Sequence, residues 1–222
     1  MGKITLKLKE LRALISEASS WHVDSDNPDH DPYARQTQIY DALEEWSRGV
    51  SIGKTMKNIT PDIVEGIKDM IKEGQMSEPD KSVTLHRGIV ISEKQLIRWL
   101  QLPPDEPLKR KGQVAAKIVV GKEGPGSWTP RGSISANFAG VSRESVAHYL
   151  DDPFAVILTA KVRDNPGAFV ELGRFSLYEE EMESMSIAPV TTSIVSWVKS
   201  GTSQRRHEVM DEIERMVKYI GI

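Results

Sequence analysis

The chain has 222 residues, of which 39% are hydrophobic and 27% charged, a composition typical of a globular protein with a real core. Its formal net charge of −3 gives no broad excess of cations for binding phosphate or membrane surfaces. It has no cysteine, which excludes disulfides, thiolate nucleophiles and cysteine-based zinc sites. No segment reaches the roughly 20 consecutive apolar residues that cross a bilayer. We therefore expect a cytoplasmic protein with no membrane partner.

The first 80 residues have the periodicity of helices. Apolar residues recur at helical spacing over residues 8–18 and again over residues 39–50. Thr60–Pro61 is a helix start, since a capping side chain precedes a proline, and Gly74 is a plausible helix stop. These signals predict a helical N-terminal segment over residues 1–80.

Between these helical patterns, residues 22–32 read HVDSDNPDHDP and are rich in oxygen ligands. The segment lacks the glycine and the distal glutamate of an EF-hand loop, and its prolines already account for a loop. We expect no metal site there.

From Val83 the pattern changes to short β-like runs separated by turns. These runs are VTLHRGIV, QVAAKIVVG, SWT, FAVILTAKV, AFVELG, MESMSIAPV and SIVSWV. Two helices interrupt them, one capped by Ser92 with Gln95 and one capped by Ser142. The mixture predicts an α+β fold with mixed or antiparallel sheets rather than a regular βαβ series. The basic run LKRKG at residues 108–112 is interpreted as a polar surface loop.

The last segment has one apolar stripe, which predicts an amphipathic helix that packs on the body of the protein. The stripe consists of Val209, Ile213, Met216 and Ile220. We expect residues 1–80, 81–200 and 201–222 to be a helical segment, a sheet-rich core and a C-terminal helix of one compact domain.

Two short motifs in the core place polar groups on strands. LHRG puts Arg87 at the end of an apolar strand with Gly88 behind it, where a guanidinium can meet a phosphate or a carboxylate. SWT presents the hydroxyls of Ser127 and Thr129 on one face of a short strand, and a predicted helix follows, ending near Phe138. Each motif alone is weak evidence for a site.

The third motif is a run of glutamates after two aromatic residues, FSLYEEEMES at residues 175–184. In a strand, residues two apart share a face, so Glu179, Glu181 and Glu183 would point together and Glu180 would point away. Such carboxylates repel one another, and a fold tolerates them most readily at a site that uses them. A solvated surface is the alternative interpretation.

In this order the three motifs resemble those of mono-ADP-ribosyltransferases of the arginine–serine–glutamate class, a group that contains bacterial toxins and bacteriophage enzymes. The resemblance covers roughly Val83 to Val198. It implies a two-sheet catalytic core preceded by helices, NAD as co-substrate and no metal. It also implies transfer of ADP-ribose to an acceptor macromolecule, most simply an arginine side chain of a host protein, while a nucleic-acid acceptor stays open.

The resemblance implies roles for single residues around NAD. Arg87 would hold a phosphate, and Gly88 would offer its backbone to the nicotinamide amide. Ser127 would bind the ribose next to nicotinamide and orient the catalytic glutamate. Thr129 would support Ser127, and Phe138 would contribute to the cofactor site.

The resemblance also assigns the glutamates. Glu181 would be the catalytic carboxylate, and Glu179 would direct transfer to arginine. Phe175 and Tyr178 would be the aromatic residues of a substrate-recognition turn. A register shifted by two, in which Glu181 and Glu183 are the functional pair, stays open.

Two other classes of function also stay open. A non-catalytic β-sandwich interaction module with a helical arm would need none of the three motifs. A carboxylate-pair glycosidase, or an NAD glycohydrolase, would use glutamates on a sugar bond. A glycosidase fits less well, because its two carboxylates face each other across the substrate.

Overall fold

The computed structural model describes residues 32–51, 59–103, 107–122, 124–146, 153–175, 182–199 and 206–218. Over these residues the chain is a mixed α+β structure with antiparallel sheets, which confirms the predicted fold class at this level. The helix predicted at residues 8–18 and nearly all of the acidic segment at residues 22–32 lie outside the described residues. None of the helices in the described ranges is long and apolar enough to cross a membrane.

A four-stranded antiparallel sheet with strand order β1-β5-β9-β2 forms the centre of the molecule. Its strands are β1 (Thr84–Ser92), β5 (Pro153–Lys161), β9 (Ile194–Lys199) and β2 (Lys111–Val114). β1 and β5 pair along their whole length. Every residue of β5 before Lys161 is buried, which explains why its sequence is a continuous apolar run rather than an alternating one.

Two smaller sheets complete the strands. One has the order β4-β7-β6, and the other pairs β3 with β8. Their bounds are β4 (Ser127–Trp128), β7 (Ser184–Ser186), β6 (Phe169–Glu171), β3 (Val119–Val120) and β8 (Val190–Thr191). Trp128 and Phe169 pack edge to face with ring centroids 5.6 Å apart, inside the apolar core that also receives β1 and β5.

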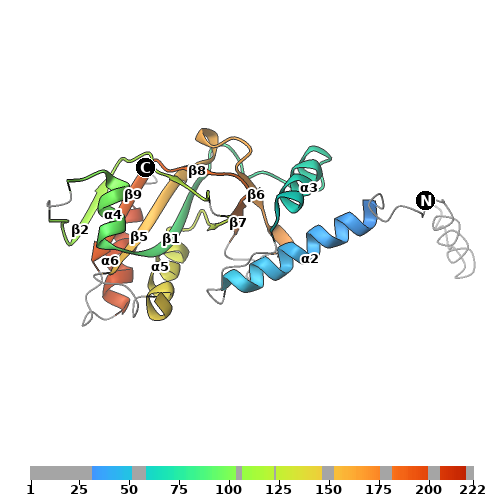
Figure 1. Ribbon diagram of the computed structural model, residues 1–222. Helices are drawn as coiled ribbons and strands as arrows, with labels where there is room; N and C mark the ends of the chain where they lie inside the picture. The colour runs from blue at the N-terminus through green and yellow to red at the C-terminus, as the bar shows by residue number, and fades with distance from the viewer. Residues whose placement is uncertain are drawn as a thin grey trace, which may run out of the picture.

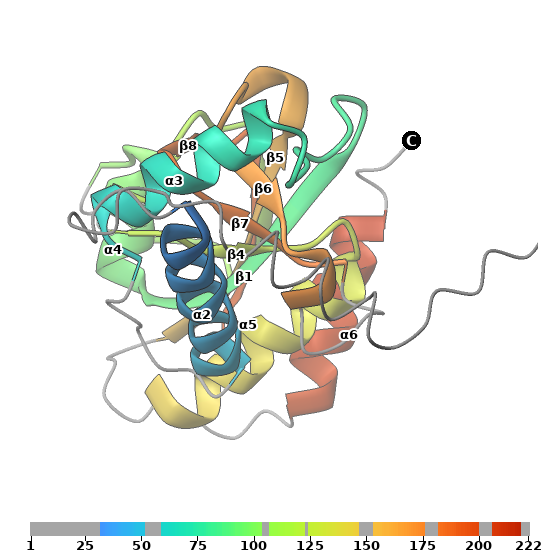
Figure 2. The same cartoon turned by 90° about the vertical axis from the view of Figure 1, so that its right-hand side faces the viewer.

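The helices form two groups (Figure 1). α5 (Gly132–Val146) and α6 (Arg206–Lys218) lie against the four-stranded sheet, whereas α2 (Pro32–Ser51) and α3 (Pro61–Lys72) lie beside β6 and β7. Figure 2 shows α2 in front of the three-stranded sheet, onto which it packs through Leu43 and Trp46. Ile213 of α6 is fully buried against α5 and β5, so the predicted packing of the C-terminal helix is confirmed.

Local signals set several helix ends where the sequence predicts them. The Thr60 hydroxyl accepts a hydrogen bond from the Ile63 N–H at 3.4 Å at the start of α3. Gly74, with φ of 72°, follows the end of α3. The Ser92 hydroxyl accepts from the Gln95 N–H at 3.3 Å and caps α4 (Glu93–Leu100).

Three sequence-based expectations are corrected. The run QVAAKIVVG is not one strand, because it is divided between β2 and β3. The basic run at residues 108–112 is only partly a loop, since Lys111 and Gly112 begin β2, where a Cβ on Gly112 would collide with the Trp197 ring. α5 is one continuous helix, so Ser142 lies inside it instead of capping a second helix. Burial of α5 against the sheet offsets the cost of a glycine within it, about 1 kcal/mol.

Candidate functional site

The candidate site lies where the four-stranded and three-stranded sheets meet. The Thr129 N–H donates to the His86 carbonyl at 2.9 Å, and the His86 N–H donates to the Thr129 carbonyl at 2.7 Å. This bridge fixes the end of β4 beside β1. On its other side β4 pairs with β7, with Ser127 opposite Met185. The junction therefore gathers residues from three strands that are far apart in the sequence.

A serine and a glutamate are in direct contact at this junction. Ser127 Oγ donates a hydrogen bond to Glu183 Oε1. Glu183 immediately precedes β7 and is only 6% exposed. Its backbone carbonyl accepts from the Leu172 N–H at 3.0 Å, which ties it to the chain that leaves β6. The serine hydroxyl thus orients the buried carboxylate, and the Leu172 N–H fixes the backbone that carries it.

Arg87 of β1 reaches the residue that precedes Ser127. A Cβ on Gly126 would collide with the guanidinium of Arg87, because the three nearest atoms to it are all guanidinium atoms. Ser186 fixes the backbone of Gly126: the Gly126 N–H donates to Ser186 Oγ at 2.8 Å, and the Ser186 N–H donates to the Gly126 carbonyl at 2.9 Å. Glycine is thus required for the close approach of the guanidinium.

The electrostatics of Arg87 favour an anionic ligand. Its side chain is half-buried, and burial lowers the pKa of the guanidinium from its ordinary value. Within the described ranges no carboxylate forms an ion pair with it. An arginine stays charged in proteins, so a half-buried guanidinium gains from a phosphate or carboxylate that can accept two hydrogen bonds.

Gly88 has a packing role of its own. A Cβ at this position would collide with the Ser135 carbonyl oxygen and lie 2.7 Å from the Ala139 nitrogen. The backbone of α5 therefore passes directly over β1 at this glycine. Packing alone explains the residue, and the binding of nicotinamide by its backbone stays a prediction.

Thr129 lies at the junction, and Phe138 lies on the helix that follows it. Thr129 is 3% exposed, and its Oγ1 accepts from the Arg131 N–H at 3.1 Å, so this hydroxyl shapes the turn into α5. Phe138 is half-buried on α5. Their contributions to a cofactor site stay predictions.

Most of the glutamate run lies outside the described residues, including Glu179, Glu180 and Glu181. The same-face argument stays a prediction for Glu179 and Glu181 and does not extend to Glu183. Glu183 is not in a strand, and Met182 before it has a left-handed φ of 46°, which interrupts the alternation of faces. Among the described residues, Glu183 is the glutamate that contacts Ser127, and it is a member of the pair in the shifted register.

The aromatic residues expected in the recognition turn are also only partly described. Tyr178 lies outside the described residues. Phe175 ends the short turn η4 (Gly173–Phe175) and is half-buried, with its ring against Tyr40 of α2 at a centroid distance of 5.1 Å.

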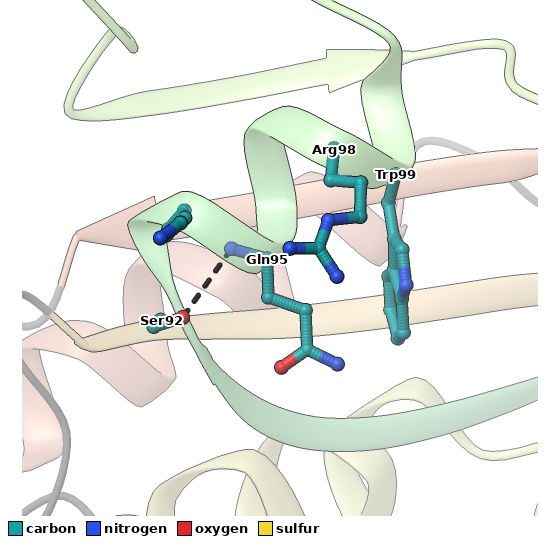
Figure 3. Close-up of a pocket in the computed structure, with 5 residues that line it drawn as sticks. Ser92, Gln95, Arg98 and Trp99 are labelled. Atoms are coloured by element: carbon teal, nitrogen blue, oxygen red, sulfur yellow. Dashed lines mark hydrogen bonds between the residues drawn. The ribbon is translucent and has the colours of Figure 1, made fainter. Parts of the chain in front are cut away.

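A hollow of about 510 Å³ lies on α4, apart from the junction (Figure 3). Its lining consists of Ser92, Lys94, Gln95, Arg98 and Trp99. Ser92 ends β1, about 17 Å of strand beyond Arg87. None of the lining polar side chains is buried, so the hollow is a surface feature of α4 rather than part of the junction.

Two contributors to the junction were not predicted from the sequence, Gly126 and Ser186. The sequence could have indicated Gly126, because this residue directly precedes the SWT motif. No pattern in the sequence indicates Ser186. Within the described ranges no group of three or more histidines and carboxylates could hold a metal ion.

A comparison of the chain with protein-family models, curated proteins and solved structures finds no match. Function is therefore inferred from the chemistry of the junction.

Proposed function

We propose that this protein is a mono-ADP-ribosyltransferase that breaks the nicotinamide–ribose bond of NAD and transfers ADP-ribose to an arginine side chain of a protein. The observation that carries the proposal is the hydrogen bond from Ser127 to the buried carboxylate of Glu183, beside the glycine over which Arg87 lies. The motifs that resemble the family thus supply a cation, a hydroxyl and a carboxylate around one junction.

Glu183 is the catalytic carboxylate in this proposal, and Glu181 is the residue that acts on the acceptor. This is the shifted register of the glutamate pair. It is favoured because the Ser127 hydroxyl bonds to Glu183, and orienting the catalytic glutamate is the role that the resemblance gives to this serine. Glu179 then has no required role.

The chemistry needs a carboxylate where positive charge develops. The bond between ribose C1′ and the nicotinamide nitrogen breaks, its electron pair leaves with nicotinamide, and nicotinamide departs neutral. The carboxylate of Glu183 stabilises the cationic ribose more in the transition state than in the ground state. The acceptor guanidinium then attacks C1′ and loses one proton, which Glu181 accepts.

Arg87 would hold the pyrophosphate of NAD. A planar guanidinium binds phosphate oxygens through two parallel hydrogen bonds, which an ammonium cannot reproduce. The half-buried position of Arg87 without an ion-pair partner among the described residues supports this role.

An NAD glycohydrolase is the second candidate. The hydrogen-bonded carboxylate of Glu183 suffices for cleavage, and water could then be the acceptor. The two activities differ in the fate of ADP-ribose, which is released by a hydrolase and becomes covalently attached by a transferase.

The test is to incubate the purified full-length protein with NAD labelled in the ribose, with and without a small guanidine acceptor and cell lysate. We expect nicotinamide release and label on the acceptor, and a loss of roughly 100-fold or more in Glu183→Gln. Release without any labelled acceptor would favour the hydrolase. A folded protein that shows neither turnover nor a thermal shift with NAD would overturn both candidates and leave the interaction module.

A further inference from the structure

The ladder between β4 and β7 is irregular at the residue that precedes β4. Ser127 lies opposite Met185, and the same register places Gly126 opposite Ser186. In a regular antiparallel ladder, two such residues exchange two backbone hydrogen bonds. One of these bonds is present, because the Ser186 N–H donates to the Gly126 carbonyl at 2.9 Å. The Gly126 N–H donates instead to Ser186 Oγ at 2.8 Å, so a side-chain hydroxyl takes the place of a backbone carbonyl.

Ser186 thus fixes both polar groups of the Gly126 backbone. Its hydroxyl also donates to the Gly126 carbonyl at 3.3 Å. Ser186 is 2% exposed and lies opposite Phe169 of β6, so its strand is paired on the other side as well. Glycine has the greatest backbone freedom of all residues, and these bonds restrict it at the position where the Arg87 guanidinium excludes a Cβ.

The side-chain bond keeps Gly126 close to the guanidinium. Without the Ser186 hydroxyl, the buried Gly126 N–H would have no acceptor among the described residues in its present position. A regular ladder would offer it the carbonyl of residue 186. Since β4 lies between β1 and β7, pairing in that way moves Gly126 towards β7 and away from Arg87 on β1.

We propose that Ser186 is a positioning residue for the binding of NAD, and that it acts through Gly126 on Arg87. Its hydroxyl holds Gly126 out of the regular ladder and against the guanidinium that binds the pyrophosphate. It takes no part in the cleavage of the nicotinamide–ribose bond. This inference rests on the proposed function and extends it from the groups that touch NAD to a group that sets their geometry.

The experiment compares Ser186→Ala with Ser196→Ala in the full-length protein. Ser196 is a matched control, because it is a fully buried serine of β9 whose Oγ accepts a hydrogen bond from Gln113 Nε2 at 3.1 Å. Both variants lose a buried hydroxyl, so we expect the Tm of each to fall. In titration calorimetry with ADP-ribose, we expect the Kd to rise about three- to tenfold in Ser186→Ala, part of the loss from removing a charge-assisted hydrogen bond. In Ser196→Ala the Kd should stay within about twofold of the wild-type value.

Two further measurements separate positioning from packing. In steady-state nicotinamide release, Ser186→Ala should raise the KM for NAD, while kcat stays within about threefold because Ser127 keeps its place between Gly126 and the retained pair of Trp128 with Ser184. In an Arg87→Lys background, Ser186→Ala should raise the Kd for ADP-ribose by less than about twofold, since both changes act on one contact. A serine that serves packing alone would lower the Tm without raising Kd or KM.

The outcomes distinguish this inference from the proposed function. If the wild-type protein and Ser186→Ala bind ADP-ribose equally well, the inference is overturned and the proposed function stands. Equal increases of Kd in the two serine variants, additive effects with Arg87→Lys, or a loss of kcat at unchanged KM would also overturn it. Ser186→Cys replaces Ser186→Ala if that variant does not fold, because a thiol is a weak acceptor of similar size. Wild-type protein that binds neither NAD nor ADP-ribose would overturn the proposed function, and this inference with it.

Discussion

Replacing Gly126 by alanine tests the geometry of the junction most directly. The added Cβ would collide with the Arg87 guanidinium, which is the flexible end of a side chain and can move away. The backbone of Gly126 does not have a positive φ, so alanine is compatible with it. We therefore expect Gly126→Ala to fold with a stability within about 1 kcal/mol of wild type.

The expected cost falls on ligand binding. If Arg87 binds pyrophosphate, displacing its guanidinium removes charge-assisted hydrogen bonds worth about 1.5–3 kcal/mol. Since 1.4 kcal/mol corresponds to a tenfold change in a dissociation constant, the Kd for ADP-ribose should rise about 10- to 150-fold. Titration calorimetry with ADP-ribose measures this without interference from turnover.

Arg87→Lys is the comparison variant. It should weaken ADP-ribose binding to a similar degree, because an ammonium cannot make the paired contacts of a guanidinium. The double variant should lose little more than either single variant, since both act on one group. Wild-type affinity in Gly126→Ala, or additive losses in the double variant, would refute the assignment of Arg87 to the phosphate.

Three further predictions concern stability and catalysis. Gly88→Ala should lower the free energy of unfolding in urea by roughly 1–3 kcal/mol, because the added Cβ collides with the backbone of α5, which cannot move aside as a side chain can. Unchanged stability would contradict this packing. In the nicotinamide-release and transfer assays, Glu183→Gln should abolish both activities. Glu181→Gln should spare cleavage and lose transfer, and Glu180→Gln should change little. If Glu181→Gln loses cleavage instead, Glu181 is the catalytic glutamate, as in the unshifted register. Burial lowers the pKa of His86 to about 4. The unfolded chain therefore takes up a proton on this histidine near pH 6.5, before the native state does. The free energy of unfolding should consequently fall by about 2–3 kcal/mol as the pH decreases from 6.5 towards 4. Urea titrations at both pH values should show a smaller loss in His86→Gln, and equal losses would mean that other groups carry the effect.

Signals that act within a few residues could be read from the sequence. The Thr60 cap, the Ser92 cap and the stop at Gly74 depend on neighbouring backbone groups, and the structure has all three as predicted. The strand β5 was also predicted, as the β-like run FAVILTAKV, and the structure adds that it is buried over nearly its whole length.

Contacts between distant segments could not be read in this way. The pattern of β4 shows which side chains share a face, but not that β4 lies between β1 and β7, which brings Ser127 to Glu183. The fit of Gly126 to Arg87 is likewise a tertiary contact without a local pattern.

The entrance to β7 shows what hydrophobic periodicity does not predict. By its pattern of residues, Met182 would be the first apolar residue of a strand that follows Glu181. In the structure Met182 is 59% exposed, the strand begins at Ser184, and Met185 is the buried methionine. A left-handed residue at the entrance to a strand has no signature in hydrophobic periodicity.

The bridge between His86 and Thr129 also bears on when the site forms during folding. It joins two residues that are more than forty positions apart in the sequence, and the partner of His86 in β5, Thr159, is further along still. Contacts of such high sequence separation slow folding, because long loops have to close before the pairing stabilises them. Arg87, Ser127 and Glu183 therefore meet only after residue 183 has been synthesised and the sheets have assembled. A nascent chain that stops before Glu183 carries the arginine and the serine without the carboxylate.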